Sequence, residues 1–450
     1  MRLPTAATVL LFAACSAPPE AVDKPLNFIV IMADDLGYGD LSTYGGWIDV
    51  PNIDRMAAQG LKFTDFHSNG AVCSPTRAAL MTGRYQQRAG IPVVVFAPED
   101  RPTHIDGLQE VEYTFAEMLR ERGYSTGIFG KWHLGYYPRY NPTVQGFDEF
   151  KGYVSGNVDF FSHVDGAGRF DWWHDVEKSD EPGYVTSLIN KHAVDFIERH
   201  KDQPFCLYVP HEAPHNPYQG PNDDPKGFRV AGGFSGQLVQ SDEEIKRKYR
   251  EMVVEMDKGV GAILDTLERL NLAENTLVFY ISDNGATPKG SNGPLRGFKA
   301  SVWEGGHRVP GIAWRPGSIE PGTETEQLAA SMDIWPTIAE FAGESMPTNR
   351  ALDGVSLVPT LEGGSVNRGP MFWSFMDGLA MRDGDWKLVQ GEDGKEEPLL
   401  FNLADDLGEQ TDLSLREPER AAQMVGAARQ WLDEVNASAT PQPSNEKTAP

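Results

Sequence analysis

The chain has 450 residues, of which 40 are Lys or Arg and 65 are Asp or Glu, so its formal net charge is −25. This length is sufficient for a large core and for two structural units. The acidic excess repels nucleic acid and anionic membranes, which excludes nucleic-acid binding as a general activity. An anionic substrate therefore needs a local positive pocket in an otherwise acidic protein.

The N-terminal stretch MRLPTAATVLLFAACSAPPE carries one Arg, a short apolar run and small residues before Cys15. This order is typical of a secretory signal, and the apolar run is too short to span a bilayer. The ending LFAAC resembles a bacterial lipobox, which would place a lipid on Cys15. We therefore predict signal peptide, lipobox and linker over residues 1–22, and an exported protein of the periplasm or the outer-membrane cell surface of a bacterium. The lipid would be its only contact with a membrane.

Four short apolar runs predict buried parallel strands, with helical patterns between them. A polar cluster follows each run directly: Asp34 and Asp35 after NFIVIMA, Lys131 and His133 after STGIFG, His211 and His215 after PFCLYVP, and Asp283 and Asn284 after TLVFYIS. Alternating strands and helices predict an α/β fold with a large, mostly parallel sheet flanked by helices, over residues 23–335. Ligands of such sheets bind outside the carboxyl ends of the strands, so we expect the four clusters to meet at one edge.

The stretch VCSPTRAALMTGRY places a cysteine at a predicted helix start. Pro75 and the helix formers that follow it predict a helix that begins near Cys73 and ends at Gly83. The free N–H groups of a helix N-terminus favour an anion, and Arg77 lies on the same helical face as Cys73. Three cysteines form no disulfide framework, and Cys206 lies in an apolar run where it is expected to be buried.

Asp34, Asp35, Asp283 and Asn284 offer only oxygen ligands. An isolated Asp pair is most often part of a turn or a helix cap. At one sheet edge, however, these four side chains suit a hard cation such as Ca²⁺ or Mg²⁺ better than Zn²⁺. Arg77, Lys131 and Lys299 supply positive charge.

The chain changes character after about Asp333. DIWPTIAEFAG predicts a helix, and MFWSF, LAMRDGDWKLVQ and EPLLFNLADDLGEQ predict short antiparallel strands. We therefore predict a smaller C-terminal domain over residues 336–436, closed by a helix near REPERAAQMVGAARQWLDEV. Residues 437–450 are polar and are expected to be disordered.

CSPTRAALMTGR resembles the C-x-P-S-R signature of type I sulfatases, formylglycine-dependent members of the alkaline-phosphatase-like superfamily, with Thr76 in place of the usual Ser. Other stretches resemble further blocks of that family in the same order: NFIVIMADDLGYGDLSTYGG, GKWHLG, PHNP, SDNG and LRGFKASVWEGGHRVP. The resemblance implies a sulfuric ester hydrolase. It also implies that a formylglycine-generating maturase oxidises Cys73 to 3-oxoalanine, whose hydrate is the nucleophile.

The resemblance assigns roles to individual residues. It implies one Ca²⁺ ion held by Asp34, Asp35, Asp283, Asn284 and the modified Cys73. Arg77 would hold the diol, His133 would act as base, and Lys131 and Lys299 would bind sulfate oxygens. His215 would protonate the leaving alcohol, with His211 as the lesser candidate for that role, and Ser155 would be a further sulfate contact.

A long loop, NVDFFSHVDGAGRFDWWHD, lies between Asn157 and Asp175. Long loops at strand ends commonly carry function. Trp172 and Trp173 are candidates for stacking on sugars, and His163, Arg169 and His174 for contacts to hydroxyls or further sulfates. The alternative is that these aromatic residues pack the loop down. The expected substrate is a sulfated carbohydrate, either a polysaccharide or its oligosaccharides.

Two other functions remain open from the sequence. One is a phosphomonoester, phosphodiester or phosphonate hydrolase of the same superfamily, although two-metal members typically carry His beside the Asp that corresponds to Asp283. The other is a non-catalytic glycan-binding lipoprotein, in which Cys73 would stay a thiol.

Overall fold

The computed structural model describes residues 24–230, 232–234, 240–347 and 350–443. The predicted signal peptide and Cys15 lie outside the described residues. A ten-stranded mixed sheet is the centre of the molecule, in the order β13-β2-β12-β11-β1-β8-β4-β5-β6-β7. Its strands are β1 (Asn27–Ala33), β2 (Leu61–Phe63), β4 (Ser125–Lys131), β5 (Glu149–Tyr153), β6 (Trp173–His174), β7 (Glu177–Lys178), β8 (Phe205–Pro210), β11 (Thr276–Ser282), β12 (Gly311–Trp314) and β13 (Thr323–Thr325).

The strands from β11 to β5 run parallel, and the four predicted strands are four adjacent members of this group. Their side chains are buried on both faces, as expected for a parallel sheet covered by helices. The predicted fold class is confirmed.

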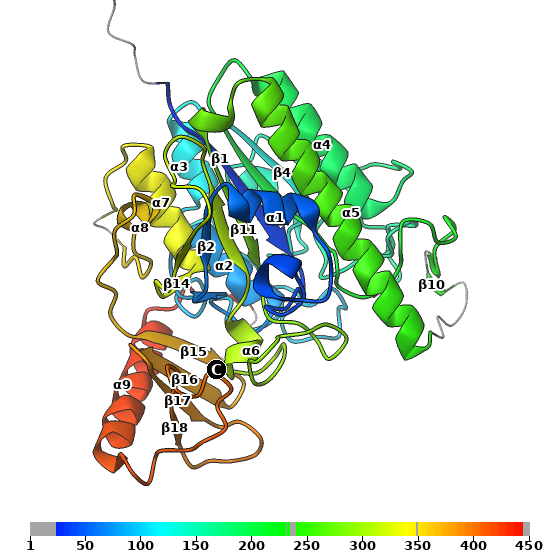
Figure 1. Ribbon diagram of the computed structural model, residues 1–450. Coiled ribbons are helices and arrows are strands. Elements are labelled where there is room, and N and C mark those ends of the chain that lie inside the picture. Colours follow the sequence, from blue (N-terminus) through cyan, green and yellow to red (C-terminus); the bar gives the residue numbers. More distant parts are fainter. Residues whose placement is uncertain (1–23, 231, 235–239, 348–349, 444–450) are drawn as a thin grey trace, which may run out of the picture.

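Helices cover both faces of the sheet (Figure 1). Phe28, Val30 and Met32 of β1 belong to one core, while Ile29 and Ile31 belong to the other, because successive side chains of a strand point to opposite faces. The first core is covered by α2 (Cys73–Thr82), α3 (Phe115–Glu121), α7 (Ile334–Phe341) and α8 (Val358–Leu361). The second is covered by α1 (Pro51–Ala58), α4 (Val185–His200) and α5 (Asp242–Arg269).

Short elements complete the described chain. The remaining strand pairs are β3 (Phe66–His67) with β14 (Ala329–Ala330), and β9 (Arg229–Val230) with β10 (Gly233–Phe234). The 3₁₀ turns are η1 (Ser42–Tyr44), η2 (Pro138–Tyr140), η3 (Pro142–Gln145), η4 (Ala273–Asn275) and η5 (Ser331–Asp333).

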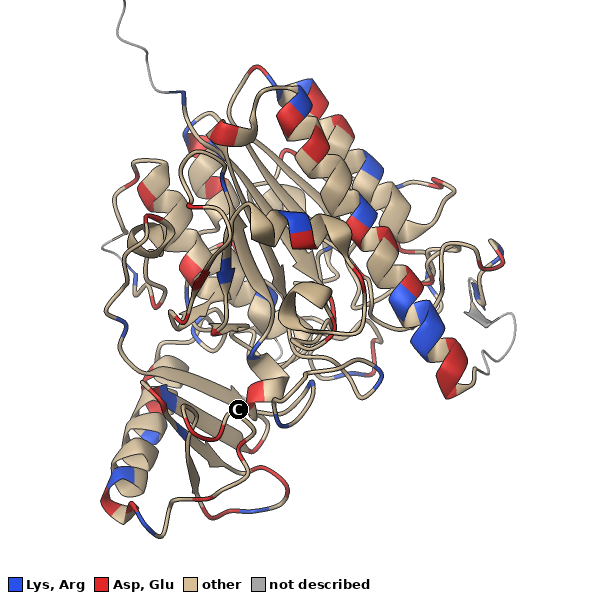
Figure 2. Ribbon diagram, viewed as in Figure 1, with Lys and Arg blue, Asp and Glu red and all other residues tan. Residues whose placement is uncertain are grey.

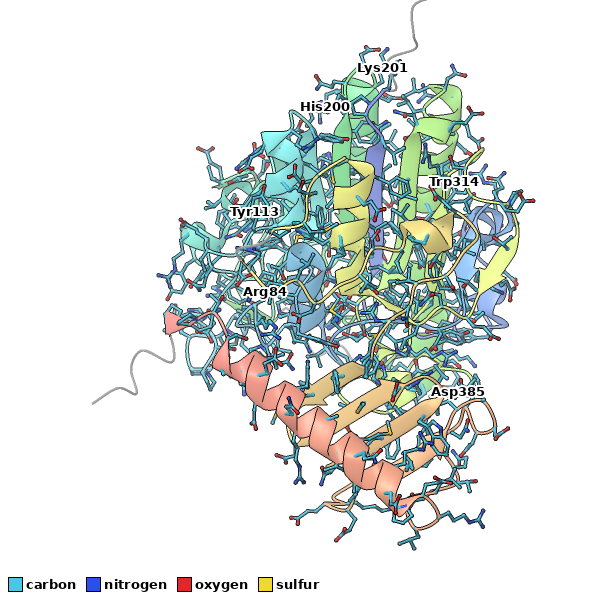
Figure 3. All side chains as sticks on the ribbon, turned by 90° about the vertical axis from the view of Figure 1, so that its left-hand side faces the viewer. Arg84, Tyr113, His200, Lys201, Trp314 and Asp385 are labelled. Carbon is cyan, nitrogen blue, oxygen red and sulfur yellow. The ribbon has the colours of Figure 1, made fainter. Side chains whose placement is uncertain are left out.

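The C-terminal part forms an antiparallel sheet of β15 (Met371–Phe375), β16 (Gly378–Asp383), β17 (Trp386–Gln390) and β18 (Leu399–Asn402). Helix α9 (Pro418–Ala437) lies across one face of this sheet (Figure 3). Helix α7 crosses the predicted domain boundary at residue 335, and its residues Trp335 and Ile338 pack in the core of the large sheet. The division of the chain at residue 335 stays a prediction.

The described end of the chain differs from the predicted disordered tail. Thr440 donates its backbone N–H to the carbonyl of Arg88, and the side-chain oxygen of Gln442 accepts from the N–H of Gly107 at 3.1 Å. Gln442 is buried. The prediction of disorder is therefore wrong for residues 438–443, because hydrogen bonds to the first domain compensate for their polarity.

Charged residues lie side by side with those of opposite sign along α5 (Figure 2).

Among the described residues, no helix is both long and apolar enough to cross a membrane.

A buried charge network joins the two sheets. Glu304 lies on α6 (Glu304–His307), and its carboxylate is 2.7 Å from the ammonium group of Lys387 on β17. The same carboxylate is 3.3 Å from the guanidinium groups of Arg308 and Arg382. Glu304 and Lys387 are fully buried, so each depends on the other for compensation of its charge.

We expect Lys387→Met to lower the free energy of unfolding by about 3 kcal/mol, near the lower end for a broken buried ion pair, because Glu304 keeps its two arginines. Chemical denaturation measures this loss. The exposed Lys395→Met, in the loop between β17 and β18, is the control and should change stability by less than about 0.5 kcal/mol. Equal effects of the two substitutions would contradict the role of the network.

Candidate active site

The carboxyl ends of β1 and β11 bring two acidic pairs together. The strands are parallel and in register, with Ala33 opposite Ser282, so the next residues, Asp34 and Asp35, lie beside Asp283 and Asn284. The backbone N–H of Asp35 donates to Asp283 at 3.2 Å. All four side chains are buried.

Cys73 is the first residue of α2, as predicted from Pro75. Its Sγ lies 3.5 Å from Asp34 Oδ1 and 3.3 Å from the Nζ of Lys299. The helix ends at Gly83, whose φ of 67° is the left-handed conformation that glycine adopts readily. The edge of the sheet and the start of the helix therefore meet at the Cys73 sulfur.

The hydroxyl of Thr76 anchors the turn before α2. Its Oγ1 accepts from the N–H of Gly70 at 3.0 Å and donates to the carbonyl of the same residue at 3.1 Å. A serine in this position carries the same hydroxyl. The departure from the family signature therefore keeps the group that holds the turn.

Three cations neutralise the three carboxylates. Arg77 donates to Asp283 Oδ2 through Nη2 at 2.8 Å and through Nε at 3.2 Å. Lys131, at the end of β4, lies 2.5 Å from Asp34, and Lys299 lies 2.5 Å from Asp35. The site therefore brings three cationic groups together in an otherwise acidic protein, each of them paired with one carboxylate.

The two neighbouring carboxylates differ in their proton affinity. Burial and the charge of Asp283 raise the pKa of Asp34 to about 7. Burial also acts to raise the pKa of Asp35, but Lys299 and His215 outweigh it and hold that pKa below its usual value. Negative charge is therefore undercompensated around Asp34, where a further cation would be favoured.

The side chain of Asn284 indicates that the site can hold a metal ion. Its Nδ2 donates to Asp35 Oδ1 at 2.8 Å, while its Oδ1 is buried and has no hydrogen-bond partner among the described residues. An amide oxygen left free beside three carboxylates is the donor set of a hard divalent cation. The residues therefore fit Ca²⁺.

His133 and His215 flank the sulfur at the wall of the site. His133 Nε2 donates to the carbonyl of Val95 at 3.0 Å, so Nδ1, which has no partner among the described residues, is free to accept a proton. Burial and the charges of Lys131 and Arg77 hold the pKa of His133 well below its usual value. The imidazole is therefore neutral and suited to act as a base.

His215 also presents one free nitrogen. Its Nδ1 donates to the carbonyl of Asn216 at 2.6 Å, and its Nε2 lies 3.6 Å from Asp35 Oδ2. Burial lowers the pKa of His215 to about 3, so the imidazole is neutral in the free protein.

A cavity of about 330 Å³ opens over these groups. Its lining includes Cys73, His133, Ser155, His215 and Lys299. It also includes residues that the sequence analysis missed: the apolar segment 94–98 together with Tyr136 and Asn157. A signal for this segment exists in the sequence, since PVVVFAP is an apolar run that belongs to no strand or helix and leaves Phe96 40% exposed.

Several predicted substrate contacts lie elsewhere. Trp172 is fully buried and His163 is 2% exposed, and the two rings stack on each other with centroids 4.7 Å apart. Neither ring can reach a sugar, so these two predictions are wrong: the rings pack the loop down, as the alternative had it. His211 is also fully buried and is not part of the cavity lining, so its role as the lesser candidate for the acid stays a prediction.

The other loop residues have different positions. Arg169 lines a second cavity, which shares Pro98 and Gly166 with the first, and its side chain is 39% exposed. Trp173 Nε1 donates to Asp171 at 2.6 Å, and His174 Nε2 contacts Glu181 at 3.0 Å. Arg169 thus stays a candidate for contacting an extended substrate, whereas His174 belongs to a separate polar cluster.

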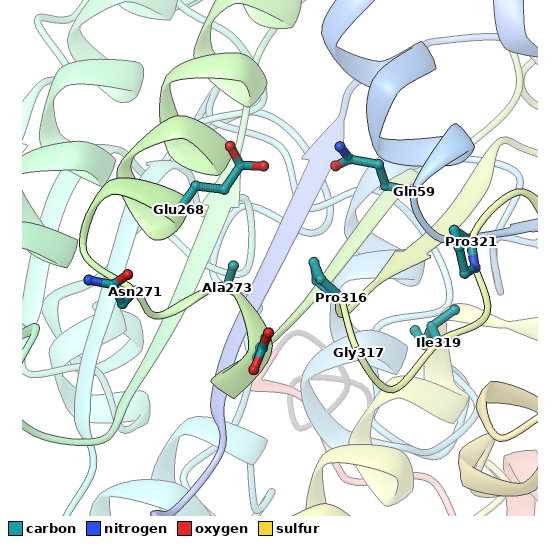
Figure 4. Close-up of a pocket in the computed structure, with 9 residues that line it drawn as sticks. Gln59, Glu268, Asn271, Ala273, Pro316, Gly317, Ile319 and Pro321 are labelled. Carbon is teal, nitrogen blue, oxygen red and sulfur yellow. The ribbon is translucent and has the colours of Figure 1, made fainter.

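A larger cavity of about 520 Å³ lies at the opposite end of β11 (Figure 4). Gln59, Glu268 and Asn271 contribute its polar groups, and Pro316 and Ile319 contribute apolar ones. The groups that carry nucleophilic and cationic chemistry lie instead at the carboxyl end of the sheet.

Comparisons with known proteins identify the family of this chain. The family model described as Sulfatase matches residues 26–344. The N-acetylgalactosamine-6-sulfatase of Canis lupus familiaris is 32% identical over 467 residues, covering 91% of this chain and 86% of that protein. A crystal structure of Ps i-CgsB superimposes with a TM-score of 0.82 at 29% identity, covering 91% of this chain and 93% of the other. A second crystal structure holds Ps i-CgsB in complex with k-i-k-neocarrahexaose and has a TM-score of 0.81 at 28% identity, with the same coverage. With a family model matched over most of its length and such relatives, this chain belongs to the sulfatase family and is a sulfatase.

Proposed function

We propose that the protein removes sulfate from a sulfated carbohydrate, using a formylglycine made from Cys73 and one Ca²⁺ ion. The observation that carries this proposal is the position of the Cys73 sulfur. It lies within 3.5 Å of both a metal-binding carboxylate and the ammonium group of Lys299, in the lining of an open cavity. Burial and the carboxylates of Asp283 and Asp34 raise the pKa of the thiol to about 12, so an unmodified Cys73 is a poor nucleophile.

Oxidation changes what this residue offers. Once converted to formylglycine, residue 73 would supply as its hydrate one hydroxyl that attacks sulfur while the ester bond from sulfur to the alcohol oxygen breaks and the alcohol leaves. Deprotonation of the second hydroxyl would then break the C–O bond to sulfate, release sulfate and restore the aldehyde. The Nδ1 of His133 accepts that proton, because its Nε2 is committed to the carbonyl of Val95. Arg77, held by Asp283, orients residue 73 from one helical turn away.

Asp34, Asp35, Asp283 and Asn284 would hold the calcium ion. A bound divalent cation polarises a sulfate oxygen and stabilises the charge that develops at the transition state. Lys131 and Lys299 extend their ammonium groups to the same place from β4 and from the loop after β11. They bind the remaining sulfate oxygens and shield them from the surrounding carboxylates, and Ser155, buried in the cavity lining, is a further candidate contact.

His215 is the proposed general acid. Its Nδ1 is committed to the carbonyl of Asn216, so the proton must leave from Nε2. The negative charge of a bound sulfate ester opposes the effect of burial and raises the proton affinity of this imidazole. A bound sulfate ester therefore favours the protonated form that a general acid requires.

A carbohydrate substrate is supported by the relatives and by the cavity. One relative is an N-acetylgalactosamine-6-sulfatase, and Ps i-CgsB has been crystallised with a neocarrahexaose. The apolar segment 94–98 lines the same cavity as Lys299, and apolar groups pack well against the C–H faces of sugars. We also propose, from residues 1–22 and the Cys73 signature, an exported bacterial protein that carries a lipid on Cys15 and depends on a formylglycine-generating maturase.

Substitution of Cys73 tests the nucleophile. We expect Cys73→Ala to reduce hydrolysis of sulfate esters to background with an unchanged melting temperature. Mass spectrometry of the wild-type peptide that contains residue 73 should show the aldehyde. The matched control is Cys206→Ala in the apolar core of β8, which should lower stability and leave the aldehyde in place. Full turnover by Cys73→Ala would exclude the mechanism, as would phosphate esters being cleaved as fast as sulfate esters by the wild type.

Removal of the free amide oxygen tests the metal ion. We expect Asn284→Ala to weaken calcium binding by at least about tenfold, since each oxygen ligand contributes to affinity. Calorimetric titration of the chelator-treated protein measures this loss, and the exposed Asn367→Ala is the control. Stoichiometric zinc in place of calcium in the active protein would contradict the proposed ion.

The role of His215 is tested by the leaving group. General acid catalysis matters most for a poor leaving group, so His215→Ala should lose about 10²–10⁴-fold in kcat on a sulfated sugar and clearly less on an activated aryl sulfate. Steady-state rates on both substrates make this comparison. Equal losses on the two substrates would assign His215 to binding sulfate instead.

A further inference from the structure

A second cluster of metal-ligating side chains lies outside the site described above. It consists of His174 on β6, Glu181 in the loop after β7, and His192 on α4. One ligand atom from each residue lies within 4.8 Å of the other two. Three separate segments of the chain thus bring two imidazoles and a carboxylate together.

Three hydrogen-bond donors of this cluster converge on a single atom, Glu181 Oε2. Glu181 Oε2 receives His192 Nε2 at 2.8 Å, His174 Nε2 at 3.0 Å and Trp172 Nε1 at 3.4 Å. A carboxylate oxygen offers about two lone-pair directions, so three donors exceed its capacity. Glu181 Oε1, by contrast, has Lys191 Nζ at 3.7 Å. The Nε2 atoms of both imidazoles therefore converge on one carboxylate oxygen. A metal ion bound between these three atoms would satisfy them better than two N–H donors do.

We propose that His174, Glu181 and His192 form a binding site for a divalent transition-metal ion such as Zn²⁺. Two imidazole nitrogens and one carboxylate oxygen are a ligand set that Zn²⁺ accepts, and the 35% exposed His174 side chain leaves room for water at the fourth position. Lys191 contacts the other carboxylate oxygen and leaves Oε2 to the ion.

Both imidazoles can bind a metal ion without releasing a proton to the solvent. On binding, each neutral ring keeps its hydrogen, which moves from Nε2 to Nδ1 and frees the Nε2 lone pair. Burial lowers the pKa of His192, which favours the neutral form that a metal requires. The Nδ1 of His192 is buried and has no partner among the described residues, so moving the hydrogen there breaks no hydrogen bond of the protein, although the N–H gains no acceptor among those residues.

A metal ion at this site would link the edge of the large sheet to helix α4. β6 and β7 are the two outermost strands, and His192 belongs to α4, which packs against the sheet. Asp171 lies two residues before β6, and its carboxylate accepts a hydrogen bond from the N–H of Ser155 at 2.8 Å. The site would therefore stabilise the loop that carries the cavity residues Ser155 and Asn157.

Metal titration of the full-length chain tests the proposal. The parent protein carries Cys73→Ala and saturating Ca²⁺, because Cys73, Asp34, Asp35 and His215 also form a group of potential ligands. Calorimetry with Zn²⁺ should show one equivalent bound, and Co²⁺ should give the visible absorption of a tetrahedral ion. This readout is independent of sulfatase activity, so failure here is distinguishable from failure of the proposed function.

Variants locate the ion. His174→Ala, at a partly exposed position, and Glu181→Gln should each weaken Zn²⁺ binding by at least about 100-fold, the upper range for loss of a supporting residue at a metal site. His200→Ala is the matched control, since His200 lies on the same helix and contacts a single carboxylate, Glu149, at 3.1 Å. It should bind Zn²⁺ like the parent. Absence of Zn²⁺ binding in the parent, or unchanged binding in both cluster variants, would overturn the proposal.

Discussion

The structure depends on compensating the charges of three carboxylates buried at the ends of two parallel strands. Asp34, Asp35 and Asp283 lie together because β1 and β11 are in register, and burial of such a group without counter-charge is prohibitive. Each carboxylate has its own cation, from α2, from β4 and from the loop that precedes α6. The arrangement that permits burial also aims three positive groups at one place, which is what binding of an anionic ester requires.

The C-terminal sheet supports this arrangement from a distance. The loop that carries Lys299 is fixed at Ala300, whose N–H donates to the carbonyl of Ala71, two residues before Cys73. The same loop leads directly into α6, where Glu304 is held by Lys387 of the small sheet. A cation of the active site and the start of α2 are therefore both connected to the small sheet through one short stretch of chain.

Much of the architecture was predictable because it follows from local patterns. Buried parallel strands read as continuous apolar runs, and residues directly after them must lie at the carboxyl edge of the sheet. This rule alone brings Asp34, Lys131 and Asp283 to the same edge. Cys73 was predictable as a helix start because Pro75 restricts the backbone there. These inferences needed only neighbouring residues.

The contacts of the long loop were not predictable in the same way. Whether Trp172 faces a sugar or the core depends on how the loop folds back on α4 and β5, and neither is encoded in the local pattern around it. The convergence of Glu181 with two histidines from different elements, and of Glu304 with Lys387 of the small sheet, likewise depends on tertiary packing. Buried polar clusters of this kind leave no periodic signal in the sequence.

The central claim is that the charge cluster at the sheet edge is a calcium and sulfate site built around residue 73. A crystal structure of the exported, matured protein grown with calcium and sulfate tests it most directly. The account predicts an ion held by Asp34, Asp35, Asp283 and Asn284, with a sulfate between Lys131 and Lys299 and an aldehyde or its hydrate at residue 73. An ion and a sulfate bound elsewhere, with both lysines still paired to the carboxylates and an intact thiol at Cys73, would contradict it.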